Sequence, residues 1–345
     1  MDRGIDSLRK TQAEDGSWSE DRSPGVTGIA LTGLLRTGKV TPDDPMAKKA
    51  IQYILSLVNP EKHHIAGKAP VIQLQNYVTS VNVMALVAAN RDEYKKVIGD
   101  ATEFLKQLQW DEGEGVQPKD PEKGAYYGGF GYDSHNRPDL SNTQFALDAL
   151  VAAGIPSDDP ALKKAQVFVS RCQNLKGEGN DQPWADKIND GGFIYTPAAG
   201  GQSKVGGDPQ TGLPSYGSMT YAGVKSMIYA GVNKDDPRVK AGYEWIKKHY
   251  TVEANPGMPK TQQGLYYYYH TMAKCLSAMD VDYVVDSQGV KHDWRADITQ
   301  ALAKRQRPDG SWKNDADQWM EGDANLVTGY ALLALSYCKP KTAQP

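Results

Sequence analysis

Four ionisable side chains fall within seven positions of one segment: Asp133, His135, Arg137 and Asp139. A carboxyl group and an imidazole placed together can exchange protons with a bound molecule. The same side chains can equally hold together the glycine-rich loop in which they lie. We therefore take His135 and Arg137 as candidate ligand-binding residues and Asp139 as a candidate catalytic residue.

Asp139 also begins a segment that is typical of the start of a helix. An Asp or Ser in this position accepts hydrogen bonds from the free backbone N–H groups of the first turn, and the helix dipole favours its negative charge. Asp139 is thus either a helix cap or a proton-transfer group. Ser141 and Asn142, which follow it, are candidate polar walls of a ligand cavity.

Tyrosine is unusually frequent, with 19 Tyr against 5 Phe. A tyrosine joins an apolar ring to a polar hydroxyl, so several of them can line a cavity for an elongated apolar molecule. Each one can also pack between helices, and four consecutive tyrosines at 266–269 cannot all point the same way. The aromatic residues predicted to bind a ligand are Tyr126, Tyr127, Phe130, Tyr216 and Tyr269.

The elements that must position these residues form a repeat. A threonine opens a small-residue, weakly charged helical stretch six times, at intervals of about 50 to 80 residues, and a more charged helical stretch precedes each one. Weakly charged helices belong inside a fold and charged ones outside. The sequence therefore predicts an all-α fold of six helical hairpins; the threonines are Thr27, Thr79, Thr143, Thr220, Thr271 and Thr328.

The first and last repeats share a phrase, since 12–18 reads QAEDGSW and 306–312 reads QRPDGSW. Two near-identical phrases at opposite ends suggest a ring that closes on itself. We expect one domain over residues 1–338 and a loose tail at 339–345.

Composition excludes several classes of protein. The chain has 345 residues, 39% of them hydrophobic, and a net charge of −3, which gives no reason to expect binding to nucleic acid. No apolar run approaches the ~20 residues of a membrane span, although peripheral membrane contact stays open. We expect a cytoplasmic protein or one whose leader has been removed, and the sequence does not indicate an oligomeric state.

The two shared phrases resemble the glutamine-tryptophan (QW) repeats of squalene-hopene and oxidosqualene cyclases, a superfamily that includes protein prenyltransferase β subunits. The resemblance covers nearly the whole chain. It implies an α/α toroid in which inner helices line a central cavity, outer helices form a second ring, and Trp18 and Trp312 are structural.

The residues that carry chemistry in that superfamily are only partly present. Squalene-hopene cyclases have an Asp-x-Asp-Asp-Thr segment whose central Asp protonates the substrate, and Asp139 and Thr143 match it. Ser141 stands at the position of the acid, and a hydroxyl cannot protonate an alkene.

In prenyltransferases a His before Thr is a zinc ligand, and His270 matches it. The neighbouring repeat supplies neither Asp nor Cys, so we expect no metal and no cofactor. His270 is then a hydrogen-bonded cavity residue or a general acid or base, and we take it with Asp139 as the second candidate catalytic residue.

The resemblance implies a small apolar ligand, isoprenoid or similarly elongated, held in the central cavity, with isoprenoid cyclisation as the reaction if the protein is an enzyme. Two alternatives stay open. One is a non-catalytic toroid that binds a lipid, a glycan or a protein, and the other is an enzyme similar to polysaccharide lyases, which use Tyr, His and Arg on related toroids. A deep apolar pocket would favour the isoprenoid, and an open polar groove would favour the glycan.

Overall fold

The structure is a computed structural model that describes residues 1–68, 74–133, 136–177, 179–260 and 262–339. These residues form twelve α-helices, five short 3₁₀ helices and one two-stranded antiparallel sheet. The prediction of an all-α fold is confirmed. The helices are α1 (Asp2–Thr11), α2 (Gly25–Arg36), α3 (Pro45–Ser56), α4 (Gln75–Ala89), α5 (Lys95–Gln107), α6 (Leu140–Ala152), α7 (Pro160–Arg171), α8 (Gly217–Tyr229), α9 (Pro237–Lys248), α10 (Leu265–Ala278), α11 (Trp294–Arg305) and α12 (Ala324–Tyr337).

The shorter elements lie in the connections between these helices. The two strands pair next to each other before α11. They are β1 (Val284–Val285) and β2 (Lys291–His292), and the 3₁₀ helices are η1 (Asp92–Tyr94), η2 (Glu112–Glu114), η3 (Gly124–Tyr126), η4 (Ala198–Gly200) and η5 (Gln318–Met320).

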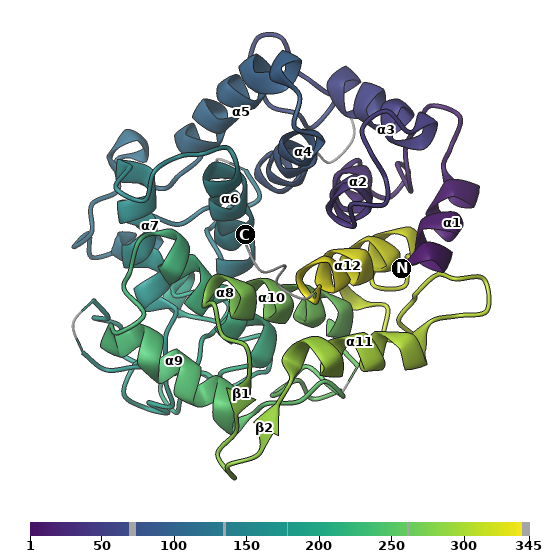
Figure 1. The fold of residues 1–345 in the computed structure, drawn as a ribbon. Coiled ribbons are helices and arrows are strands. Elements are labelled where there is room, and N and C mark those ends of the chain that lie inside the picture. Colours follow the sequence, from purple (N-terminus) through teal and green to yellow (C-terminus); the bar gives the residue numbers. More distant parts are fainter. Residues whose placement is uncertain (69–73, 134–135, 178, 261, 340–345) are drawn as a thin grey trace, which may run out of the picture.

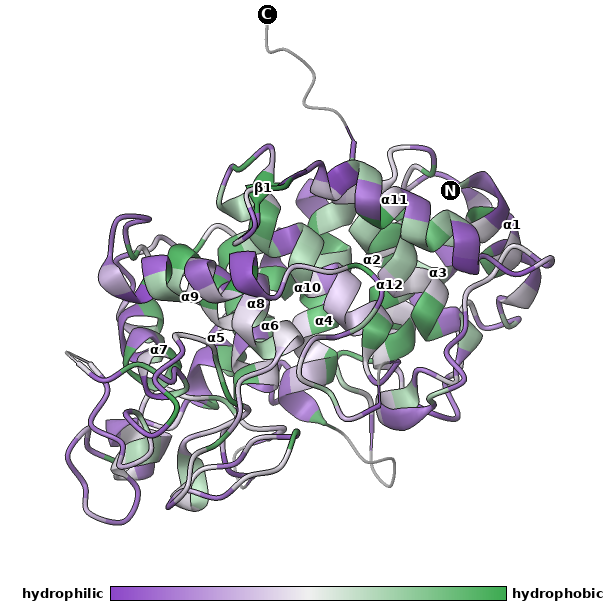
Figure 2. Ribbon diagram, turned by 90° about the horizontal axis from the view of Figure 1, so that it is seen from below, coloured by the Kyte–Doolittle hydropathy of each residue, from purple (hydrophilic) through white to green (hydrophobic). Residues whose placement is uncertain are grey.

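The even-numbered helices form an inner ring. Each packs against the next, from α2 through α4, α6, α8 and α10 to α12, and α12 packs against α2 (Figure 1). The odd-numbered helices lie outside, each against one or two inner helices. The long connections gather at the end of the ring where the inner helices begin (Figure 2).

Burial separates the two sets of helices, as the sequence pattern predicts. Nearly every residue of α2 and α12 is buried, whereas α1 and α9 bury a single face. Hydrophobic residues accordingly concentrate on the inner helices and hydrophilic ones on the outside (Figure 2). A helix that is apolar all round is stable only inside a fold, which is why these six lie in the inner ring.

The repeated threonine has a physical role in five of the six repeats. Its hydroxyl accepts a hydrogen bond from the backbone N–H of a buried residue in the preceding connection. The N···O distances are 2.9–3.1 Å. An N–H buried at such a place needs an acceptor. The pairs are Trp18 with Thr27, Ile65 with Thr79, Phe130 with Thr143, Phe193 with Thr220, and Trp312 with Thr328. In the fifth repeat, the Thr271 hydroxyl donates instead to carbonyls of its own helix.

Glutamine side chains tie neighbouring hairpins together. The amide of Gln12 donates to the Gly16 carbonyl at 3.0 Å and to the Met46 carbonyl, on α3, at 2.9 Å. Gln109 and Gln173 make the same pair of contacts, reaching the first turns of α7 and α9 respectively.

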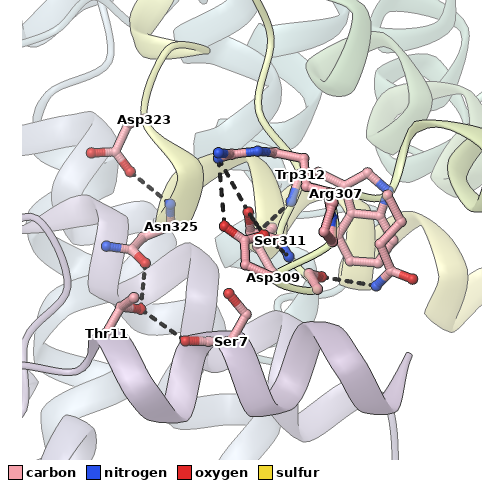
Figure 3. Close-up of polar contacts among 12 residues, drawn as sticks. Ser7, Thr11, Arg307, Asp309, Ser311, Trp312, Asp323 and Asn325 are labelled. Carbon is pink, nitrogen blue, oxygen red and sulfur yellow. Dashed lines mark hydrogen bonds and ion pairs between the residues drawn. The ribbon is translucent and has the colours of Figure 1, made fainter.

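The two ends of the chain meet through α1 and the last repeat (Figure 3). The Thr11 hydroxyl donates to Asn325 Oδ1 at 2.6 Å. The Arg3 guanidinium donates to the carbonyls of Arg307 and Pro308 at 2.8 and 2.9 Å. Within the described residues, no helix is long and apolar enough to cross a membrane. Residues 340–345 of the predicted tail lie outside the described part of the chain.

Candidate functional site

A cavity of about 290 Å³ lies at the end of the ring where the inner helices begin, and we call it the N-terminal cavity. Its wall is mostly aromatic and apolar, with a few polar side chains. The residues that line it are Ser23, Leu74, Tyr77, Tyr132, Ser141, Asn142, Phe145, Tyr195, Lys204, Tyr216, Ser218, Met219, Asn255, Met258, Gly264, Tyr267, Trp319, Met320, Glu321, Leu326 and Tyr330.

First turns of inner helices supply much of this wall, and the connections supply the rest. In η5, Trp319 and Met320 have positive φ angles of 56° and 65°, and Trp319 remains 51% exposed beside the cavity. Non-glycine residues seldom adopt this backbone conformation, which tends to occur where a side chain must be held in a particular place. An exposed tryptophan held in this way is a natural contact for an apolar ligand.

Asp139 caps α6 and is 2% exposed. Its carboxylate accepts from the Asn142 backbone N–H at 2.9 Å and from the Asn142 side-chain amide at 2.8 Å, and the Tyr195 hydroxyl lies nearby. Burial raises the pKa of Asp139, while these hydrogen bonds oppose the shift. Asn142 and Tyr195 line the cavity, so Asp139 lies behind the wall and is separated from the cavity by these two side chains.

Glu321 is a second buried carboxyl group, and it lines the cavity directly. One oxygen accepts the Tyr267 backbone N–H at 2.8 Å, at the start of α10, and the other accepts the Asn314 amide at 2.6 Å. Burial raises the pKa of Glu321 to about 7. A carboxyl group with this pKa is present in both protonation states near neutral pH, as a general acid or base requires.

Five aromatic side chains, which we call the aromatic layer, lie across the ring at the inner end of the cavity. They are Tyr77, Phe145, Tyr267 and Tyr330, which line the cavity, and His270, which packs against them. The His270 ring stacks on those of Tyr330 and Phe145, with centroids 5.6 and 6.3 Å apart. The hydroxyls of Tyr77 and Tyr330 lie 3.1 Å apart. His270 is 2% exposed, and burial together with nearby lysines lowers its pKa well below the usual value. His270 is therefore a neutral ring packed among aromatic groups at neutral pH.

Beyond the aromatic layer lies a group that we call the charged cluster: Asp148 on α6, Lys225 on α8 and Lys274 on α10. The carboxylate of Asp148 lies 2.7 Å from the Lys225 amine and 2.8 Å from the Lys274 amine. All three side chains are buried, and burial lowers the pKa of both lysines, that of Lys225 to about 8. The two ammonium groups hold the pKa of Asp148 below its usual range.

A chain of hydrogen bonds joins the charged cluster to the N-terminal cavity. Lys225 donates to the side-chain oxygen of Gln144, whose amide nitrogen lies 3.0 Å from the Tyr267 hydroxyl. That hydroxyl lies 3.1 Å from the Ser141 hydroxyl at the cavity wall. Because an ammonium group has no acceptor, the oxygen of Gln144 must face Lys225 and its NH₂ must face Tyr267.

The structure brings three of the predicted ligand-binding residues to the cavity wall, Ser141, Asn142 and Tyr216. Arg137 lies just behind it, bonded to Gln202 at 2.5 Å and 5.8 Å from the centre of the Tyr195 ring. His135 lies outside the described residues.

Four other predicted residues lie away from this wall. Tyr126 packs edge-on against Trp110, and the Tyr127 hydroxyl donates to Glu112 at 2.7 Å. Phe130 lies in the main hydrophobic core, and the Tyr269 hydroxyl donates to the Val252 carbonyl at 2.5 Å. The contacts of these four residues are those of packing between elements.

Glu321 and Lys204 line the cavity but were not among the predicted residues. Both come from connections, where no helical periodicity marks which side chains face inward. Among the described residues, no group of three or more His, Cys, Asp or Glu side chains is arranged to hold a metal ion.

No family model and no curated protein matches the chain. Among solved structures it is similar to a protein from Actinoplanes, with a TM-score of 0.41 and 14% identity over 98% of both chains. It is also similar to the type II terpene cyclase MstE from Scytonema. A variant in complex with its substrate, geranylgeranyl dihydroxybenzoate, has a TM-score of 0.35 and 13% identity over 98% of this chain and 95% of that one. The apo form gives a TM-score of 0.33 and 13% identity over the same shares. A shared function does not follow from scores this low, and a specific relation to squalene-hopene cyclases or prenyltransferases stays a prediction.

Proposed function

We propose that residues 1–338 form a single α/α toroid of six hairpins whose N-terminal cavity binds an isoprenoid or similarly elongated apolar molecule that carries an oxygen atom. The observation that carries this proposal is the cavity wall, in which aromatic and apolar side chains surround a few polar groups. Such a wall suits a ligand that is apolar along its length and polar at one point. A cavity wall that is mainly aromatic and apolar does not suit a glycan, which favours an open polar groove.

The hydrogen-bond chain sets the polarity of the ligand group beside Ser141. Gln144 donates to the Tyr267 oxygen, so the buried Tyr267 hydrogen finds its acceptor in Ser141. The Ser141 hydroxyl hydrogen is then free to point into the cavity. The ligand group that it meets is therefore an acceptor, such as a carbonyl, an ether or an epoxide oxygen.

The volume of the cavity sets the length of the ligand. The volume of about 290 Å³ lies just below the usual range for small-molecule sites, which is about 300–1,000 Å³. This volume favours a sesquiterpenoid chain over a triterpene. The aromatic layer closes the inner end, so a longer chain would have to leave through the mouth beside Trp319.

If the protein is an enzyme, the available acids fit a reaction that begins at an oxygen. Glu321 lies at the wall and Asp139 lies behind it, and burial raises the pKa of both carboxyl groups. Such weak acids do not protonate an alkene, but they can donate a proton to an epoxide or carbonyl oxygen as it takes on negative charge. A cyclisation or isomerisation started in this way needs no Asp at position 141.

Binding is tested with ligands matched in length, farnesal and the hydrocarbon farnesene, followed by isothermal titration calorimetry. We expect farnesal to bind more tightly by about 2-fold to 12-fold, the value of one net hydrogen bond of about 0.5–1.5 kcal/mol. In Ser141→Ala this difference should disappear while farnesene binding is unchanged. Equal affinities for the two ligands in the unmodified protein would contradict the assigned acceptor.

Turnover is tested by mass spectrometry after incubation with farnesal, 10,11-epoxyfarnesol, squalene and oxidosqualene, beside a control without protein. We expect a new product from an oxygenated farnesyl substrate that is lost in Glu321→Gln or Asp139→Asn. Binding without any product would favour the non-catalytic alternative. If neither farnesal nor farnesene binds in calorimetry and no new product forms, the proposed function is wrong.

A further inference from the structure

A second cavity, of about 360 Å³, lies at the other end of the ring, where the inner helices end, and we call it the C-terminal cavity. The aromatic layer and the charged cluster separate it from the N-terminal cavity. Its wall combines apolar side chains of the inner helices with the charged residues Arg36, Asp148 and Lys274.

Positive charge exceeds negative charge around this cavity. Lys274 and Arg36 line it, and Lys225 lies next to Lys274 in the charged cluster. These three cations lower the pKa of His270, and one carboxylate, Asp148, opposes them. Asp148 balances one of the two buried lysines and leaves the other uncompensated, and the exposed Arg36 adds a further positive charge. Uncompensated charges next to a low-polarity wall are unfavourable unless a counter-charge joins them.

The ring of His270 forms part of the wall of this cavity. The side chain is 98% buried, and its Nδ1 atom has no hydrogen-bond partner. Buried polar atoms without a partner are rare in folded proteins, and each calls for an explanation. This atom has almost no accessible surface, so a ligand in the cavity does not reach it, and the indication of a ligand comes from the charges and the apolar wall.

Helix ends offer another explanation for the cations, because the carbonyls at helix C-termini attract positive charge. This attraction is confined to the last turn. Lys225 and Lys274 lie about one turn before the ends of α8 and α10, and their ammonium groups face Asp148 instead of the terminal carbonyls. Arg36 is the last residue of α2, so the helix end accounts for its charge, but it does not account for the excess charge of the two lysines.

Much of the remaining wall is apolar, including Ile29, Leu35, Met84 and Leu333. We propose that the C-terminal cavity binds a carboxylate with an aliphatic tail, the carboxylate beside Lys274 and Arg36 and the tail along these apolar side chains. This second site is independent of the ligand proposed for the N-terminal cavity.

The experiment compares octanoate, octanol and acetate by isothermal titration calorimetry on the full chain. Octanoate and octanol share the tail, and octanoate and acetate share the charge. We expect octanoate to bind about tenfold more tightly than either of the others, because charge-assisted hydrogen bonds add to burial of the tail. A tenfold excess of farnesal should leave octanoate binding unchanged.

Two variants locate the site. Lys274→Met leaves Asp148 paired with Lys225, and Arg36→Gln changes an exposed residue, so both are expected to fold. Each should weaken octanoate binding by about tenfold and leave octanol binding unchanged. Lys248→Gln, at an exposed position on α9, is the matched control and should bind octanoate normally. Equal binding of octanoate and octanol, no binding of octanoate, or normal binding by both cavity variants overturns the proposal.

Discussion

Removing the charge of Asp148 tests whether the charged cluster is held by electrostatics. In Asp148→Asn, two buried ammonium groups lose contacts of 2.7 and 2.8 Å with their one shared carboxylate. Leaving a buried charge without its partner costs about 3–5 kcal/mol of unfolding free energy. In Lys274→Met, the remaining Asp148–Lys225 pair is balanced, so we expect a change of less than about 1 kcal/mol.

The cost of neutralising a lysine limits the penalty in Asp148→Asn. At pH 7 the removal of one lysine proton costs about 4.6 kcal/mol, and at pH 9.5 it costs about 1.2 kcal/mol, from the ordinary lysine pKa. The penalty should therefore shrink strongly at the higher pH. A penalty of about 3–5 kcal/mol corresponds to a fall in Tm of about 4–7 °C for 345 residues.

The assay is thermal and urea unfolding of both variants and the unmodified protein, followed by circular dichroism at pH 7 and 9.5. In the unmodified protein, the folded pKa of Lys225 of about 8 lies below its unfolded value. The folded state therefore binds fewer protons between these values, and the Lys225 contribution to stability rises as pH increases above about 8. Buried tyrosines such as Tyr267, whose pKa is raised, oppose this rise above pH 10, which is why 9.5 is the upper limit. An Asp148→Asn penalty that is the same at both pH values, or no larger than that of Lys274→Met, would refute the reasoning.

Three further predictions concern the N-terminal cavity and the repeat. Thr143→Val leaves the buried Phe130 N–H without its acceptor. It should lower the unfolding free energy by about 1–3 kcal/mol in urea titrations. A loss below about 0.5 kcal/mol would contradict the role of the repeated threonine. Asp139→Asn keeps a helix-capping oxygen but loses an acceptor for the Asn142 amide. We expect the unfolding free energy to fall by about 1–2 kcal/mol in the same titration. A larger fall would show that Asp139 is more than a cap. Glu321 has a folded pKa of about 7, above its unfolded value of 4.5, so its contribution to stability is complete below pH 4.5 and is lost as pH rises to about 7. In Tm measurements over that range, the Glu321→Gln variant should lack this loss, and parallel Tm curves for the two proteins would show that Glu321 keeps an ordinary pKa.

The all-α fold was predictable because local signals repeat. Helices poor in charge alternate with charged ones, and a threonine recurs at the start of the former. The structure shows that the threonine hydroxyl accepts a buried N–H, which only a small hydroxyl side chain at that place can do. Repetition makes such a role visible, because one local geometry demands the same residue several times.

The sequence also contains a pattern that indicates the charged cluster, although the sequence analysis did not predict the cluster. Asp148 and Lys225 each interrupt an otherwise weakly charged helix, and both follow their repeat threonine at the same spacing. Equivalent positions on inner helices of one ring face the same level of its axis, so opposite charges there predict a buried pair. Lys274 lies at a different spacing, and its place in the cluster follows only from the packing of α10.

Glu321 was not predictable in the same way. It lies just after η5, in a connection without periodicity, and a partner from another repeat, the start of α10, determines its burial. The same reasoning explains why Tyr126 and Tyr127 lie away from the cavity. Sequence identifies a tyrosine-rich connection, but the packing of that connection decides which rings face inward.

The two cavities share the inner helices but draw on different parts of them. The N-terminal cavity is built from first turns and long connections, and the C-terminal cavity from the later turns. The aromatic layer and the charged cluster lie between the two, so a change in a connection can alter the N-terminal cavity without moving the other one. Ser141 and Asp148 are nevertheless linked by hydrogen bonds through Tyr267, Gln144 and Lys225. The ammonium group of Lys225 sets the direction of those hydrogen bonds, so Ser141 presents its hydrogen to the N-terminal cavity as long as Lys225 stays protonated.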